Sequence, residues 1–168
     1  LAVEVGRIVD GLALTLEACA VGPGNAARQS ELARWLSRLN RNDEALASVA
    51  RALALVPQSA PCWDTIGVVL SRAGRHEQAV ACFERAVELD PERAGLHFNH
   101  AASLKFLGRF AEAETAYEAC VRCDPHFWRA HSALAATRRQ SPERNHLARL
   151  ERLLTTGSLD PDAELHLR

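Results

Sequence analysis

Apolar residues recur along the chain at the spacing of α-helices, in stretches separated by short polar breaks. Between Ala60 and Ala73 they form a stripe with a period of about 3.6 residues. The stripe consists of Trp63, Ile66, Gly67, Val69 and Leu70. Ser59 stands directly before it, where a hydroxyl can cap the first N–H groups of a helix. The pattern predicts a helix over residues 60–73.

A second stripe covers residues 77–89, after a break at Gly74. Its apolar face consists of Ala79, Cys82, Phe83, Ala86 and Val87. Glycine suits the break because it adopts a positive φ at little cost. Asp90-Pro91 ends the stripe, because proline lacks an N–H and disfavours helix in the residue before it. Two helices joined by so short a break are predicted to lie antiparallel.

This two-helix pattern recurs with a period of 34 residues. The period is shared by Pro23, Pro57, Pro91 and Pro125. It is also shared by two columns of small residues, Gly11, Ala45, Ala79 and Ala113 in one and Ala18, Ala52, Ala86 and Cys120 in the other. The break has glycine at Gly6, Gly74 and Gly108 and asparagine at Asn40. Small residues let the paired helices approach closely, and stacked hairpins bury one another's remaining apolar sides.

The repeat predicts a single all-α domain over residues 1–168. Residues 1–23 correspond to the second helix of a partial unit, and 26–59, 60–93 and 94–127 are full units. Residues 128–158 form a divergent unit, and residues 159–168 begin a further helix. Because the first helix lacks its partner and the chain has no Met, we expect it to be a piece of a longer protein.

The repeat resembles that of the tetratricopeptide repeat (TPR) family. One unit carries Pro61-Cys62-Trp63, Gly67, Gly74-Arg75, Ala79, Phe83, Ala86 and Asp90-Pro91, and the next carries Phe98-Asn99-His100-Ala101, Gly108, Ala113, Tyr117, Cys120 and Pro125. The first full unit departs from the family at Val49, where an aromatic is preferred. The resemblance implies a right-handed superhelical solenoid of antiparallel helix hairpins. It also implies a non-enzymatic scaffold that binds a peptide or partner protein in its concave groove.

The C-terminal part is similar to the junction in bacterial sulfotransferases that carry N-terminal TPR units. The similar segments are Asn145–Leu154, Leu159-Asp160 and Leu165–Arg168. This resemblance implies an alternative function, in which the chain is the regulatory or acceptor-recruiting arm of a catalytic domain beyond Arg168. The chain itself has no strand followed by a Gly-rich phosphate loop.

Composition narrows the range of partners. Twenty basic residues meet twenty-one acidic ones, so no overall field attracts nucleic acid or a membrane surface. No apolar run approaches the ~18 residues of a membrane span. Five cysteines form no recognisable disulfide framework, which indicates free thiols in a reducing compartment and a cytoplasmic protein. Apolar surface at the ends of the solenoid could drive self-association.

The sequence offers no catalytic constellation, and we expect no cofactor and no metal. Cys120 and Cys123 have CxxC spacing, but both fall at apolar helix positions, where free Cys packs as a small hydrophobe. His97, His100 and His131 are interpreted as structural hydrogen-bonding residues, with a metal or pH-sensitive contact as the alternative.

The concave groove implied by the TPR resemblance is the candidate binding site. The positions that line it in the family hold Ser30, Arg34, Ser37, Arg38, Asp64, Thr65, Val68, Ser71, Arg72, Phe98, Asn99, Ala102, Lys105, Phe106, Arg129, Ser132 and Arg139. Six of these are basic and only Asp64 is acidic, so the groove is predicted to attract an acidic peptide. Asp64 and Val68 stand where the family's carboxylate clamp has Lys and Asn, so binding of a chaperone C-terminus is not expected.

Overall fold

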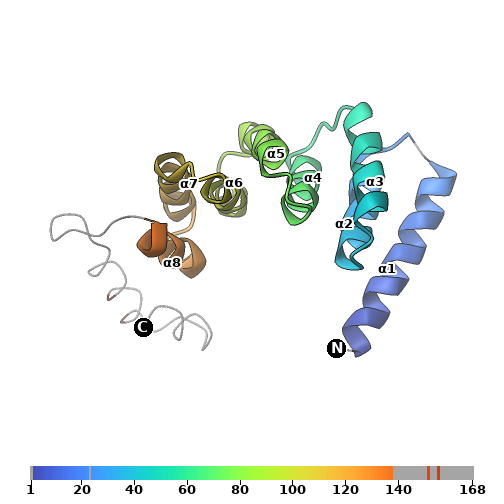
Figure 1. Ribbon diagram of the computed structural model, residues 1–168, viewed down its shortest axis with the longest axis horizontal. Coiled ribbons are helices and arrows are strands. Elements are labelled where there is room, and N and C mark those ends of the chain that lie inside the picture. The colour runs from blue at the N-terminus through green and yellow to red at the C-terminus, as the bar shows by residue number, and fades with distance from the viewer. Residues whose placement is uncertain (1, 23, 138–150, 152–154, 156–168) are drawn as a thin grey trace. The chain divides into compact units, whose positions relative to one another are not determined.

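The computed structural model describes residues 2–22, 24–137, 151 and 155. Over these residues it is built from α-helices, without a strand. The helices are α1 (Ala2–Val21), α2 (Ala26–Arg38), α3 (Asn42–Ala54), α4 (Ala60–Arg72), α5 (His76–Leu89), α6 (Ala94–Phe106), α7 (Phe110–Cys123) and α8 (Trp128–Thr137). Three hairpins, α2–α3, α4–α5 and α6–α7, repeat along the chain (Figure 1).

Each hairpin turns at the residue that the sequence pattern indicated. Asn40, Gly74 and Gly108 have φ angles of 58°, 73° and 74°. The residue after Gly74 closes the turn, because the N–H of Arg75 donates to the carbonyl of Leu70 at 2.8 Å. Equivalent bonds close the other two turns, so all three hairpins have the same helix C-cap, in which the positive φ lets the chain reverse.

The columns of small residues pack inside the hairpins, as predicted. Ala45, Ala79 and Ala113 are between 0 and 1% exposed. Gly67 of α4 faces Phe83 of α5, and a Cβ on Gly67 would lie 2.6 Å from the ring. A large ring can therefore fill the hairpin only because the opposite helix has no side chain at that point.

Helix N-termini follow the sequence less closely. Ser59 occupies the N-cap position of α4, but its side chain makes no capping hydrogen bond, so the predicted cap is only positional. A side-chain cap forms at α2, where Asn25 accepts from the N–H of Arg28 at 3.0 Å. The predicted helix from Trp128 is described as far as Thr137, and the expected elements after it lie outside the described residues.

The helices group into two compact units, residues 1–90 and 91–168. Their boundary lies between Asp90 and Pro91, just after α5 and shortly before the repeat that begins at residue 94. That residues 1–168 form one domain stays a prediction.

Candidate partner-binding site

The ten residues predicted to form the core of the binding groove are distributed over both units. Arg34, Arg38, Asp64, Thr65 and Arg72 belong to α2 and α4 of the first unit, and Phe98, Asn99, Lys105, Phe106 and Arg129 belong to α6 and α8 of the second. Each group therefore has to be judged on its own surroundings.

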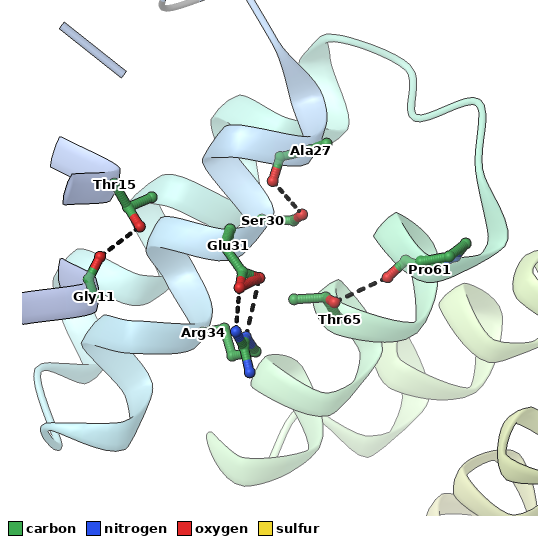
Figure 2. A network of polar contacts seen from close by, with 8 residues as sticks. All are labelled: Gly11, Thr15, Ala27, Ser30, Glu31, Arg34, Pro61 and Thr65. Carbon is green, nitrogen blue, oxygen red and sulfur yellow. Dashed lines mark hydrogen bonds and ion pairs between the residues drawn. The ribbon is translucent and has the colours of Figure 1, made fainter. Parts of the chain in front are cut away.

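In the first unit, two predicted site residues make their contacts within their own helices (Figure 2). Arg34 forms an ion pair with Glu31, and its Nε donates to Glu31 Oε2 at 3.0 Å. The Thr65 hydroxyl donates to the carbonyl of Pro61 at 2.8 Å. The charge of Arg34 is thus offset by an acidic residue that the lining positions did not include, which weakens the predicted basic stripe here.

Arg34 and Arg38 also share the ring of Trp35. Their guanidinium carbons lie 4.5 and 5.7 Å from the ring centroid, within the range of cation–π attraction. The edge of the same ring lies against α1, where a Cβ on Gly11 would be 2.7 Å from it. These arginines are therefore held on a ring that packs between α1 and α2.

Two serines assigned to the groove lining are buried instead. Ser30 and Ser37 are 3 and 2% exposed. The thiol of Cys62 donates to Ser30 Oγ at 3.4 Å, and Arg72 Nε donates to Ser37 Oγ at 3.1 Å. The prediction that these serines line a solvated groove is wrong, because α2 and α4 pack directly against each other over them.

In the second unit, Phe98 belongs to an aromatic cluster. Its ring centroid lies 5.6 Å from that of Tyr117 and 5.2 Å from that of Phe127, in tilted geometry. The guanidinium of Arg129 lies 5.5 Å from the Phe98 centroid. Phe98 is half-buried, so it connects α6, α7 and the start of α8 rather than standing free in a groove.

Next to this cluster, the second unit has an apolar pocket of about 370 Å³. It is lined by Ala102, Lys105, Phe106, Phe110 and Tyr117. The Phe106 and Phe110 side chains are 74 and 54% exposed. Three predicted groove residues, Ala102, Lys105 and Phe106, thus meet at one pocket. An ammonium group stands beside exposed rings there, and the described lining contains no carboxylate.

A larger groove, of about 640 Å³, lies in the first unit and was not predicted. Its lining residues are Leu46, Val49, Ala50 and Leu53 of α3, Trp63 and Leu70 of α4, and Arg75, Gln78, Ala81, Cys82 and Arg85 on or next to α5. The sequence analysis placed three of these residues, Trp63, Leu70 and Cys82, on the apolar faces of their helices and gave none of the eleven a role in binding. Ala50 and Ala81 are the residues that could have indicated this groove, because both are small and both are exposed.

One contact recurs at the same place in three repeats, where a ring nitrogen meets the carbonyl of the repeat's proline. The pairs are Trp63 Nε1 with Pro57 at 2.9 Å, His97 Nε2 with Pro91 at 2.7 Å and His131 Nε2 with Pro125 at 2.9 Å. A carbonyl can only accept, so each ring nitrogen donates. This confirms the structural interpretation of His97 and His131 and explains why that column can hold either Trp or His.

The five cysteines are all free. Burial raises the pKa of Cys82 to about 11 and that of Cys120 to about 12. Burial also raises the pKa of Cys123, which is only half-buried and whose thiol donates to the Pro91 carbonyl at 3.5 Å. Cys120 lies at 0% exposure, so the packing interpretation of that residue is confirmed.

These environments predict the order in which thiols are alkylated. At neutral pH, iodoacetamide should modify Cys123 first, whereas Cys82 and Cys120 should react only as the fold opens, because the thiolate is the nucleophile and both groups are buried. Mass spectrometry of peptides from a labelling time course measures the order. A Cys123→Ser variant is the control and should lack the fast site. Labelling of Cys120 as fast as Cys123 would contradict this order.

A metal-binding cluster and a membrane-spanning helix are both absent from the described part of the chain. No cluster of three His, Cys, Asp or Glu side chains there could hold a metal ion. None of the helices in that part is both long and apolar enough to cross a membrane.

Comparison with known sequences identifies the family. Two sequence models, both described as tetratricopeptide repeat, match residues 24–92 and 65–126. Together they span residues 24–126, more than half of the chain, and the chain therefore belongs to the tetratricopeptide repeat family. No curated protein matches it.

Solved structures show the same fold. MamA from Desulfovibrio magneticus RS-1 superimposes with a TM-score of 0.74 at 16% identity, over 94% of this chain and 91% of the other. YrrB, described as a TPR protein with an unusual peptide-binding site, superimposes with a TM-score of 0.72 at 21% identity, over 97% of this chain and 84% of the other. At these identities the likeness defines the fold, which is the all-α TPR solenoid.

The sulfotransferase resemblance gains no support from these comparisons. The segments that carry it, residues 145–168, lie almost entirely outside the described residues. It stays a sequence-based hypothesis about a longer protein.

Proposed function

We propose that this chain is an interaction module that binds a peptide segment of a partner protein, and that it uses the apolar pocket of α6 and α7 to do so. The observation that carries the proposal is the meeting of Lys105 with the exposed rings of Phe106 and Phe110 at one pocket. YrrB, a TPR protein of the same fold with a peptide-binding site, supports this class of function.

The chemistry of the pocket favours an apolar side chain next to an acidic group. Exposed aromatic rings provide large contact area at low entropic cost, and such residues are frequent at the centres of protein interfaces. Lys105 adds a positive charge at the same place, and the described lining has no carboxylate to offset it. An aspartate or glutamate beside the inserted apolar residue would therefore be attracted.

In the first unit, taken by itself, the predicted basic stripe is weaker. Arg38 is exposed, and the hydrogen bonds of Arg72 go to neutral oxygens of Ser37, so both keep their charge for a partner. Arg34 contributes less because Glu31 is paired with it. We assign Asp64 and Asn99, both half-buried, a role in positioning the partner rather than in attracting it.

The proposal is tested by selecting binders from a displayed library of random dodecapeptides and titrating one selected peptide with a fluorescent label. Lys105→Glu and Phe106→Ala should each weaken binding by about tenfold or more, because each removes one half of the recognition. Arg122→Glu, an exposed change on α7, is the matched charge control and should have little effect. Arg72→Glu shows whether the first unit takes part.

Two results would contradict the proposal. One is a selection that yields no binder, and the other is a set of selected peptides that bind Lys105→Glu and Phe106→Ala as well as they bind the unchanged chain. Circular dichroism of both variants should show unchanged helix content, since the two positions carry little of the core.

The cytoplasmic location and self-association also remain proposals. Five free thiols support a reducing compartment. Exposed Val9, Leu14 and Leu16 on α1 support contact between chains.

A further inference from the structure

The groove between α3, α4 and α5 belongs to the first unit and is larger than the pocket of α6 and α7. Its walls are apolar, and its volume of about 640 Å³ falls in the range of sites that hold small molecules or inserted side chains. The space is open because Ala50 and Ala81, on the facing helices, are too small to fill it. Cys82, which is 4% exposed, is the most buried of the lining residues of α5.

The aromatic residue in this groove presents only apolar surface to it. Trp63 donates its single polar hydrogen to the Pro57 carbonyl at 2.9 Å. The indole therefore has no unmet hydrogen bond to solvate, and its ring is left to contact an apolar partner. In the next two repeats the same position holds a histidine, so an indole at this place is specific to this groove.

At the rim of the groove, the charges at the start of α5 differ from those at the starts of α3 and α7. At the start of α3, Arg41 pairs with Glu44, its Nε donating at 2.7 Å. At the start of α7, Arg109 pairs with Glu112 with the same Nε distance of 2.7 Å. Arg75 occupies the equivalent place before α5, but the residue three positions on is Gln78.

A glutamine cannot offset the charge of Arg75. Within the described residues the structure gives the Arg75 guanidinium no carboxylate partner, and both Arg75 and Gln78 line the groove. The second arginine of the lining, Arg85, is already paired with Glu88. The Arg75 cation therefore lies at the edge of an apolar groove, next to the Gln78 amide. At the equivalent place, the other two hairpins pair their arginine with a glutamate.

We propose that this groove is a second binding site, separate from the pocket of α6 and α7, and that it takes an apolar peptide segment whose carboxylate pairs with Arg75. The groove holds the apolar side chains against Trp63 and Leu70. The carboxylate of the segment pairs with Arg75 as Glu44 and Glu112 pair with their arginines, and the Gln78 amide donates to it.

The first test gives this hairpin the ion pair that the other two hairpins have, without changing the shape of the groove. Gln78→Glu gives Arg75 the internal partner that Arg41 and Arg109 have, and it alters no side-chain volume. From the dodecapeptide library, the peptides that bind this groove should contain an acidic residue next to apolar ones. Gln78→Glu should weaken their binding by about tenfold, by competition for one guanidinium and by charge repulsion.

Ala81→Trp provides a second and independent variant. It fills the groove from an exposed position and should block the same peptides, whatever their charge. Glu112→Gln is the matched control, because it makes the opposite exchange at the equivalent place in the second unit and should leave these peptides unaffected.

The outcomes separate the two sites. Peptides that lose affinity with Gln78→Glu and Ala81→Trp, but keep it with Phe106→Ala, support the groove. If every selected peptide responds to Phe106→Ala and none to Gln78→Glu or Ala81→Trp, the groove proposal is overturned while the α6 and α7 site stands. Selected peptides that respond to Ala81→Trp but not to Gln78→Glu would overturn the role of Arg75.

Discussion

Replacing Gly67 by valine should lower the free energy of unfolding by about 2–3 kcal/mol, because added bulk in a packed core forces side chains off their rotamers. A Cβ at this position would lie 2.6, 2.8 and 2.9 Å from three ring carbons of Phe83. The ring cannot move aside easily, since Phe83 is 1% exposed and is surrounded by core residues. The two helices of the hairpin would have to separate.

Thermal unfolding monitored by circular dichroism measures this effect, and a loss of that size corresponds to a fall of roughly 4–12 °C in Tm. Gly95→Val is the control, because a Cβ built there meets nothing within 4 Å apart from its own stretch of helix, and its effect should stay within about 0.5 kcal/mol. Combining Gly67→Val with Phe83→Leu should recover part of the loss, since the smaller side chain gives back the space. A Gly67→Val chain as stable as Gly95→Val would show that α4 and α5 do not pack as described.

The repeat explains why this part of the fold could be predicted. The close packing of the paired helices requires small residues at the positions of Ala79 and Gly67. The same requirement holds in every hairpin, so small residues recur at the equivalent positions of the sequence. The positive φ of Asn40 was predicted for the same reason, since glycine fills that place in other repeats. Val56 was not predicted: it also has a positive φ, of 50°, at a place where the next two repeats have aspartate.

The candidate site was predicted less well, because the charge and exposure of each site residue depend on the side chains around it. Its place in the repeat does not identify those side chains. Arg34 was counted as a free charge, yet Glu31 one turn away offsets it. Ser30 and Ser37 were placed by family register, and the close packing of α2 on α4 buries them. The groove at Trp63 arises from small residues on two different hairpins, so no single stretch of sequence records it.

Phe98 and Phe106 give the most direct test of which predicted site residues are structural. Phe98→Ala should lower the free energy of unfolding by about 2–3 kcal/mol, less than for a fully buried phenylalanine because the ring is half-buried. The loss comes from its ring contacts with Tyr117 and Phe127 and from the overlying guanidinium of Arg129. Phe98→Leu keeps much of the volume and should cost less than about 1.5 kcal/mol.

Phe106→Ala is the matched partner of this experiment, because it removes the same side chain from a position on the same helix that is 74% exposed. It should change the free energy of unfolding by less than about 0.5 kcal/mol while it weakens peptide binding. Denaturant unfolding and peptide titration of both variants measure the two effects side by side. If Phe98→Ala left stability unchanged and reduced only binding, Phe98 would be a contact residue of the groove, as its family position alone implied. The expected opposite result separates the aromatic cluster that holds α6, α7 and α8 together from the exposed rings that meet a partner.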